Sequence, residues 1–204
     1  QSNLLGSPVI SPTHIDTSIK WLNMFEKNDR LAHATLMIDT VLERPGSESY
    51  MKLFAEADRR NIPIFLNGPN RDQIRLLSWP KGPGFAPYEG RSGAADVTSM
   101  LLEVGKRYPN LPIILGHGMG EDGIELVKKT KNIHLELSGS FPEAGAVRRA
   151  INRVGADRIV FGTDLDVIVA GYGLGIYYEA NLSPEEDRMI MAENARRILR
   201  MPNI

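Results

Sequence analysis

Short apolar segments alternate along this chain with segments that have the 3.6-residue periodicity of amphipathic helices, and this order constrains the fold more than any other feature. Within the apolar segments, polar and apolar residues do not alternate, as they do in strands with one face in water. Strands are expected at Ala34–Asp39, Ile62–Leu66, Leu111–His117, Asn132–Leu137 and Arg158–Gly162, with a weaker sixth candidate at Pro8–Ile10. Because buried strands joined by helices form parallel sheets, the sequence predicts an α/β fold.

The intervening segments are typical of helices that cover such a sheet. Helices are expected at residues 16–28, Ser47–Arg60, Ala94–Tyr108, Glu121–Lys129, Glu143–Val154 and Ser183–Arg200. The second and third of them each place four apolar residues on one face, at i, i+3, i+4 and i+7: Tyr50, Leu53, Phe54 and Ala57 in the second, and Val97, Met100, Leu101 and Val104 in the third. The last has the clearest start, because Ser183 is a good N-cap, Pro184 suits the first helical position and Glu186 completes a capping box.

Two glycine-rich segments are expected to be loops. Residues 68–93 form either a functional loop, such as a lid, or an irregular excursion without a function. The second segment follows Asp166 and includes Gly171–Gly175. Aromatic residues in these segments would either line an apolar pocket or pack against helices: Trp79, Phe85, Tyr88, Tyr172, Tyr177 and Tyr178.

The composition excludes several classes of function. A chain of 204 residues fits one domain over residues 1–204, and its net charge of −1 gives no general attraction for nucleic acid or an anionic membrane. No apolar segment approaches the roughly 18 residues of a membrane span. The absence of Cys excludes disulfides and thiolate metal sites, and suits a cytoplasmic protein. Gln1-Ser2-Asn3 resembles the residues left after a purification tag is cleaved.

A polar residue closes each of the five clearer strands. These residues are Asp39, Asn67, His117, Ser138 and Asp164. In parallel α/β folds the carboxyl ends of the strands share one rim, and ligands bind there. The sequence therefore predicts that these side chains meet at one site for a small-molecule substrate. Asp166 and Arg71 are further candidates for substrate contact, with a surface role as the alternative.

Two of these residues have the chemistry of a metal or acid–base site. His117 precedes glycines, and a neutral imidazole is a good Zn²⁺ ligand, although it could equally be hydrogen-bonded into the rim. Asp164 ends Gly-Thr-Asp, where a carboxylate could bind metal, take a proton from metal-bound water or cap a helix. The other histidines fit this role less well, since His134 falls inside a strand and His33 precedes one.

Four successive segments resemble motifs of the amidohydrolase-related family. They read LPIILGHGMG, NIHLELSGS, GADRIVFGTDLD and AENARRIL, in the family's order and over the second half of the chain. The resemblance implies a TIM-like (β/α) barrel, shortened or incomplete because a full barrel takes about 250 residues. It also implies a divalent metal, usually zinc, with His117 as the sixth-strand ligand and Asp164 as the eighth-strand ligand and general base.

The sequence departs from the family's pattern at two metal positions. The first-strand His-x-His pair is absent, and His14-Ile15-Asp16 matches it poorly. Asn67 stands where the family has a fifth-strand His, and an amide is a weak zinc ligand. Three readings therefore remain open: a metal-dependent hydrolase acting on a small carbonyl or carboxylate compound, a decarboxylase or hydratase of the same family, and a degenerate barrel that binds a ligand or serves assembly. A shortened barrel exposes its strand edges, so a homo-oligomer is also expected.

Overall fold

Six parallel strands form one sheet in which their spatial order is their order in the sequence. The computed structural model describes residues 4–38, 43–67, 94–118, 120–139, 144–165 and 169–201. The strands are β1 (Val9–Ile10), β2 (Ala34–Met37), β3 (Ile64–Asn67), β4 (Ile113–Gly116), β5 (Ile133–Glu136) and β6 (Ile159–Val160). All five clearer strands and the weaker sixth are confirmed, each shorter than the apolar segment that predicted it.

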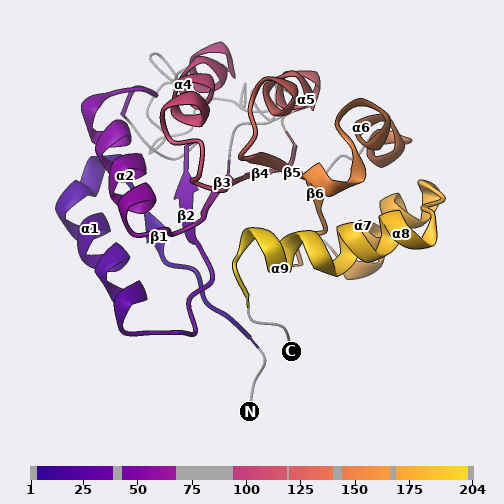
Figure 1. Ribbon diagram of the computed structural model, residues 1–204, viewed down its shortest axis with the longest axis horizontal. Helices are drawn as coiled ribbons and strands as arrows, with labels where there is room; N and C mark the ends of the chain where they lie inside the picture. The colour runs from indigo at the N-terminus through magenta and orange to yellow at the C-terminus, as the bar shows by residue number, and fades with distance from the viewer. Residues whose placement is uncertain are drawn as a thin grey trace, which may run out of the picture.

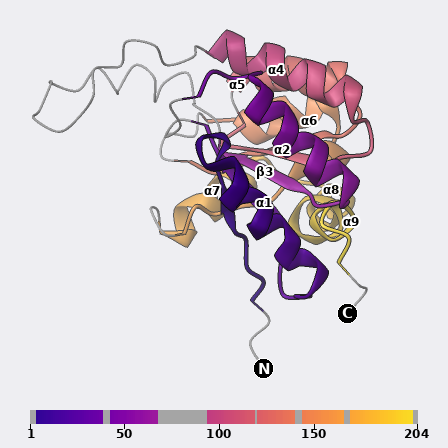
Figure 2. The same ribbon diagram turned by 90° about the vertical axis from the view of Figure 1, so that its left-hand side faces the viewer.

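Helices cover both faces of this sheet. They are α1 (Ile15–Asn23), α2 (Glu48–Arg59), α4 (Ala94–Arg107), α5 (Gly120–Lys129), α6 (Ala146–Val154), α7 (Ala170–Glu179), α8 (Pro184–Arg188) and α9 (Asn194–Ile198), with short 3-10 turns at Pro12–His14, Met24–Glu26 and Ala156–Arg158. Figure 1 shows α1, α2, α4, α5 and α6 as an arc around one side of the strands, and α7 to α9 on the other side. Figure 2, turned by 90°, again places β3 between α4 and α9.

The side of the sheet under the arc of helices holds the main core. Alternate strand residues there are fully buried, among them Leu36, Leu66, Leu115 and Leu135. They pack in one cluster with the predicted apolar faces of the helices, namely Tyr50, Leu53, Phe54, Ala57, Val97, Met100, Leu101 and Val104. The helical periodicity therefore located the buried face of α2 and α4 correctly.

A smaller cluster lies on the opposite face of the sheet. Ile198 of α9 packs with Ile114 of β4 and Val160 of β6, and Phe65 of β3 lies against them. Because these strand residues alternate with those of the main core, they belong to the inner side of the curved sheet. The C-terminal helix thus covers part of the face that a closed barrel would enclose.

The C-terminal helix is interrupted by a π turn over Met189–Glu193, between α8 and α9. The predicted capping box is confirmed, since Ser183 Oγ accepts the amide of Glu186 and the amide of Ser183 donates to the Glu186 carboxylate. Within the π turn, the carbonyl of Ile190 accepts the amide of Phe161, which follows β6, at 3.1 Å. The turn therefore ties the C-terminal helix to the last strand.

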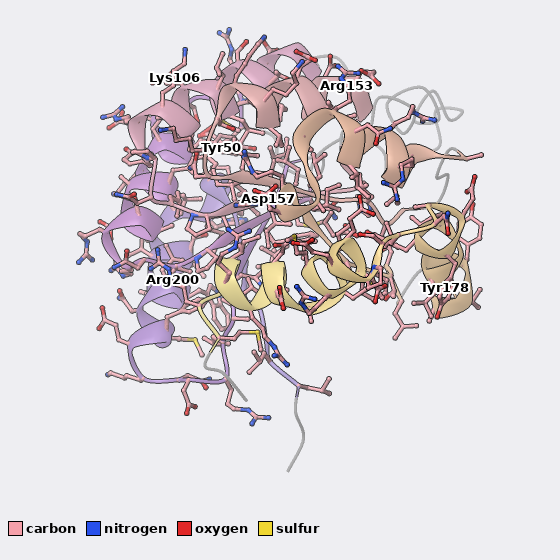
Figure 3. All side chains as sticks on the ribbon, turned by 45° about the vertical axis from the view of Figure 1, so that its right-hand side comes forward. Tyr50, Lys106, Arg153, Asp157, Tyr178 and Arg200 are labelled. Atoms are coloured by element: carbon pink, nitrogen blue, oxygen red, sulfur yellow. The ribbon has the colours of Figure 1, made fainter. Side chains whose placement is uncertain are left out.

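Helix α7 was not predicted. Its ten residues include three glycines and no charged residue before Glu179, so the segment lacks the usual helix signals. The expectation that Tyr172, Tyr177 and Tyr178 lie in a loop is therefore wrong. Tyr177 is buried, whereas Tyr178 is 79% exposed and points out from the surface (Figure 3).

Sequential parallel strands with helical crossovers are the arrangement of a TIM-like barrel, here in a shortened form with six strands among the described residues. None of the helices within the described ranges has the length and apolar character needed to cross a membrane.

Candidate functional site

The carboxyl ends of the central strands lie at the same height in the sheet. Met37 pairs with Asn67, Asn67 pairs with Gly116, and Glu136 pairs with Val160 in the parallel register. The side chains that follow these positions therefore emerge at one rim, as the sequence predicted for Asn67, His117, Ser138 and Asp164. Asp39 and Asp166 lie outside the described residues, as do Arg71, Trp79, Phe85 and Tyr88.

His117 follows β4 directly and has a left-handed backbone, with φ of 61°. This conformation is uncommon for a residue with a side chain, and such residues concentrate at functional sites. Its Nδ1 lies 3.0 Å from the carbonyl oxygen of Ser138. A carbonyl can only accept, so this contact assigns a proton to Nδ1, and in the neutral imidazole the lone pair then lies on Nε2. His117 therefore has a nitrogen available to a metal or a substrate proton.

Two glycines leave the space that the His117 ring and Leu137 occupy at the ends of β4 and β5. A Cβ on Gly139 would lie 3.1 Å from Nδ1 of His117, and a Cβ on Gly118 would lie 2.6 Å from Cδ2 of Leu137. Both glycines also have positive φ, of 143° and 63°, which disfavours any side chain there. Gly118, the residue after His117, and Gly139, which follows β5, thus permit close packing between the ends of β4 and β5.

Glu136 is a site residue that the strand-end argument missed. It is the last residue of β5 and is only 4% exposed. Its Oε1 accepts the amide of Ser138 at 2.6 Å, and its Oε2 accepts the Ser138 hydroxyl at 2.9 Å and the amide of His117 at 3.3 Å. The signal was an acidic residue inside an otherwise apolar strand, because such residues are almost never buried without partners.

Burial determines the direction of the Glu136 pKa. Desolvation raises the pKa of this carboxyl, while the hydrogen bonds from Ser138 and His117 and the charge of His117 oppose the rise. Nearby, Tyr177 of α7 donates its hydroxyl to the carbonyl of Val160 at 3.3 Å. The pKa of Tyr177 is raised by its burial first and by the Glu136 charge second, so both groups lie in a water-poor part of the rim.

The remaining predicted site residues occupy the rim with different contacts. Asn67 donates its side-chain amide to Sδ of Met37 at 3.2 Å, which leaves its amide oxygen as an acceptor. Ser138 is 7% exposed and directs its hydroxyl to Glu136, while its carbonyl contacts His117. Asp164 is partly buried at the end of the chain segment after β6, with φ of 53°. Three strand ends therefore present His117, Asn67 and Asp164 on one rim.

The described residues supply part of a metal-ligand set. His117 fits such a role because its Nε2 is unprotonated, and Asp164 is a carboxylate on the same rim. Among the described residues, no group of three or more His, Asp or Glu side chains is close enough to hold an ion.

The other two central histidines belong to the protein interior. His134 lies inside β5, as the sequence predicted; it is 4% exposed, and burial lowers its pKa to about 3. His33 lies just before β2, with its ring 5.6 Å from that of Phe65, and burial lowers its pKa to about 4. Both lie toward the amino ends of the strands, away from the rim that carries His117.

Three of the solved structures that are similar to this chain are decarboxylases with low sequence identity to it. 2,6-Dihydroxybenzoate decarboxylase from Rhizobium has a TM-score of 0.69 at 20% identity, over 97% of this chain and 71% of that one. 5-Carboxyvanillate decarboxylase from Sphingomonas paucimobilis has a TM-score of 0.68 at 15% identity, over 97% and 66%. Dihydroxybenzoic acid decarboxylase from Polaromonas sp. JS666, with bound manganese and 2-nitroresorcinol, has a TM-score of 0.67 at 18% identity, over 95% and 67%.

At these identities the structural similarity supports the fold, and the family follows from the sequence. No curated protein matches the chain. A family model described as Amidohydrolase matches residues 31–201, which cover β2 to α9 and include His117, Ser138 and Asp164. The chain therefore belongs to the amidohydrolase family.

Proposed function

We propose that this chain is a metal-dependent enzyme that acts on a small carbonyl or carboxylate compound at the rim formed by β3 to β6. The observation that carries the proposal is the contact between Nδ1 of His117 and the carbonyl of Ser138. In the neutral imidazole it leaves the Nε2 lone pair at the carboxyl end of a parallel strand, where ligands bind in such folds.

Each rim residue has a role that its chemistry allows. His117 would hold a divalent metal through Nε2, and Asp164 would hold it as well or take a proton from water or substrate. Asn67 would orient the substrate through its free amide oxygen. Asp39, Ser138 and Asp166 are further candidates for substrate contact. The metal, when bound, would supply Lewis-acid activation of a carbonyl, carboxylate or water oxygen. Zinc is the expected metal from the family resemblance, and manganese is the alternative suggested by the Polaromonas relative.

Decarboxylation is the second candidate reaction. Three structurally similar proteins are named as decarboxylases of hydroxylated aromatic carboxylates, although the likeness to them is one of fold. The two reactions give different products, because hydrolysis of a lactone or amide releases a new carboxylate whereas decarboxylation releases CO₂. Hydration is a further variant within the family. Assaying an aryl lactone and 2,6-dihydroxybenzoate side by side, with Asp164→Asn as the inactive control, separates the first two.

A barrel without catalysis, which binds a ligand or serves assembly, is the competing hypothesis. It is motivated by the absent His-x-His pair and by Asn67 in place of a histidine. Under this hypothesis His117 would have only protein partners, and adding metal would leave the protein unchanged. Homo-oligomerisation, a single domain over residues 1–204 and a cytoplasmic location also stay predictions.

Metal content measured by elemental mass spectrometry tests the proposal. We expect near-stoichiometric zinc or manganese in the purified protein and its loss in His117→Ala. His14→Ala is the matched control, because His14 is exposed at the start of α1 and follows β1, which is three strands away from β4 in the sheet. Metal-free protein that takes up neither ion after incubation, with His117→Ala behaving identically, would exclude the metal-dependent enzyme.

A further inference from the structure

We propose that Glu136 is a positioning residue that fixes the orientation and tautomer of His117 by tying together the ends of β4, β5 and β6. The inference rests on the proposed function, since it concerns how His117 is prepared for its role. Glu136 itself touches neither a substrate nor a metal in this proposal. It acts through the backbone that carries His117 and through the carbonyl that His117 contacts.

The first link runs from Glu136 to the backbone of His117. Oε2 of Glu136 accepts the His117 amide at 3.3 Å, at a residue whose φ is 61°. A left-handed backbone is unfavourable for a residue with a side chain, so it persists only when the surroundings hold it. The carboxylate is the group that accepts from this amide, and thereby it sets where the imidazole leaves the chain.

The second link runs from Glu136 through Ser138 to the imidazole. Both donors of Ser138 point at Glu136, its amide at 2.6 Å from Oε1 and its hydroxyl at 2.9 Å from Oε2. With its amide and hydroxyl fixed, Ser138 presents its carbonyl to Nδ1 of His117 at 3.0 Å. One buried carboxylate therefore fixes both partners of the contact that assigns the His117 tautomer.

The third link is steric and comes from β6. A Cβ on Gly162 would lie 2.6 Å from Cδ of Glu136, so the carboxylate occupies the space that any other residue would fill. Gly162 lies two residues before Asp164, and it has no positive φ that would itself require glycine. Its lack of a side chain is thus explained by Glu136. The carboxylate has His117, Ser138 and Gly162 on different sides, one from each of three consecutive strand ends.

Because both carboxylate oxygens of Glu136 accept hydrogen bonds, a single conservative substitution can test this role. Oε1 accepts a hydrogen bond from one backbone amide, and Oε2 accepts one from a backbone amide and one from a hydroxyl. A backbone N–H can only donate, so each oxygen must be an acceptor. In Glu136→Gln one of these oxygens becomes an NH₂ donor. Either orientation of the new amide then sets donor against donor, at His117 or at Ser138. Glutamine keeps the shape of the side chain, so the test removes the acceptor and little else.

The experiment measures the His117 tautomer by ¹⁵N-detected NMR of the imidazole in metal-free protein, together with the zinc affinity. In the wild-type protein we expect one tautomer, with the proton on Nδ1. In Glu136→Gln we expect a mixture of tautomers and a zinc affinity lowered by about 10- to 100-fold, the usual effect of losing a group that orients a ligand. Gly162→Ala, which keeps Glu136 but displaces its carboxylate, should give the same change in both measurements.

The matched control is Asn132→Ala at the other end of the same strand. Asn132 is buried just before β5 and donates its side-chain amide to the carbonyls of Tyr108 and Leu111, at 2.9 and 2.6 Å. Losing these bonds should destabilise the protein without changing the His117 tautomer. This separates a positioning role from a general loss of stability.

The outcomes distinguish the inference from the proposed function. An unchanged tautomer and zinc affinity in a folded Glu136→Gln protein, or in Gly162→Ala if the glutamine variant does not fold, overturns the positioning role alone. A wild-type protein that binds no metal overturns the proposed function, whatever the tautomer does. A tautomer change that also occurs in Asn132→Ala contradicts the inference, because it would reflect loosening of the whole strand.

Discussion

Two glycines in this chain have opposite surroundings, and substitution by alanine should affect stability with opposite sign. A Cβ on Gly116 would lie 2.7 Å from Cζ of Phe65, whereas a Cβ on Gly175 of α7 would have no atom of the described residues within 4 Å. We expect Gly116→Ala to lower the free energy of unfolding by about 1–3 kcal/mol through overpacking. Gly175→Ala should raise it by about 0.5–1 kcal/mol, because glycine is a poor helix former. Urea unfolding measures both, and equal signs would contradict the geometry.

His134 should make the protein less stable in acid. Its pKa is about 3 in the folded protein, lowered by burial and then by Arg158 and Arg197, against an ordinary value of 6.5. Between these values the unfolded chain binds a proton that the folded protein does not, so the free energy of unfolding falls as the pH falls from about 6.5 to 3. In His134→Leu the dependence should be shallower by up to about 1.4 kcal/mol per pH unit.

Denaturant unfolding between pH 4 and 7 checks this prediction. Some pH dependence remains in the variant, since burial lowers the pKa of His33 in the same direction. Identical slopes for wild type and His134→Leu would mean that His134 has the same pKa in the folded and the unfolded protein.

Single residues differed in how far the sequence could predict them. His117 and Asn67 were found because a polar residue at the end of an apolar strand has few structural reasons to be there. Glu136 was missed because a strand pattern gives only which face a residue lies on, whereas its neighbours include His117 after β4 and Gly162 after β6. The tautomer of His117 could not be predicted either, as it depends on a carbonyl 21 residues away.

Arg148 of α6 joins that helix to the connection between α7 and α8. Its guanidinium donates to the carbonyls of Ala180 and Asn181 and to both carboxylate oxygens of Glu186, at 2.8 to 3.1 Å. A lysine cannot reach all of these acceptors at once, because it has a single nitrogen. We therefore expect Arg148→Lys to lower the free energy of unfolding.

Thermal unfolding compares this variant with Arg196→Lys as its control. Arg196 is exposed on α9, and its replacement should leave the melting temperature unchanged. A melting temperature in Arg148→Lys equal to that of the control would show that the bonded guanidinium contributes no stability.

Helices and strands with a periodic apolar face were predictable, and the element without one was not. Both α2 and α4 bury the residues that their periodicity indicated. Helix α7 instead owes its position to packing, as a Cβ on its Gly173 would lie 3.1 Å from Cα of Thr163. Such a contact depends on the folded chain and leaves no local pattern in the sequence.

The molecule as a whole should associate with itself. Four apolar or aromatic side chains around α7 are exposed, namely Leu165, Val169, Tyr172 and Tyr178. Across a two-fold pair, side chains of this size would bury on the order of 1,000 Å², near the lower limit for a stable interface. We expect sedimentation velocity to give twice the monomer mass of 22.6 kDa.

Tyr178→Lys should shift this equilibrium to the monomer, because it places a charge among these exposed side chains. Met24→Lys is the control, since Met24 is 40% exposed at the end of α1, away from α7. A wild-type protein that sediments as a monomer at all concentrations would contradict self-association through the exposed residues around α7.

The π turn at Met189–Glu193 sets the rotational phase between the two halves of the C-terminal helix. Asn194, directly after the turn, donates to the carbonyls of Ala156 and Ile159, both at 2.8 Å. Deleting one residue of the turn would give a more regular α-helix, yet it would rotate Asn194 by about 100° around the axis. Asn194 would then lose its hydrogen bonds to both carbonyls. The carbonyl of Ile190 would accept a hydrogen bond within the helix instead, so the amide of Phe161 would lose its acceptor. The irregular helix is therefore the one that matches the sheet, and a shorter chain with better helical geometry would fold less stably.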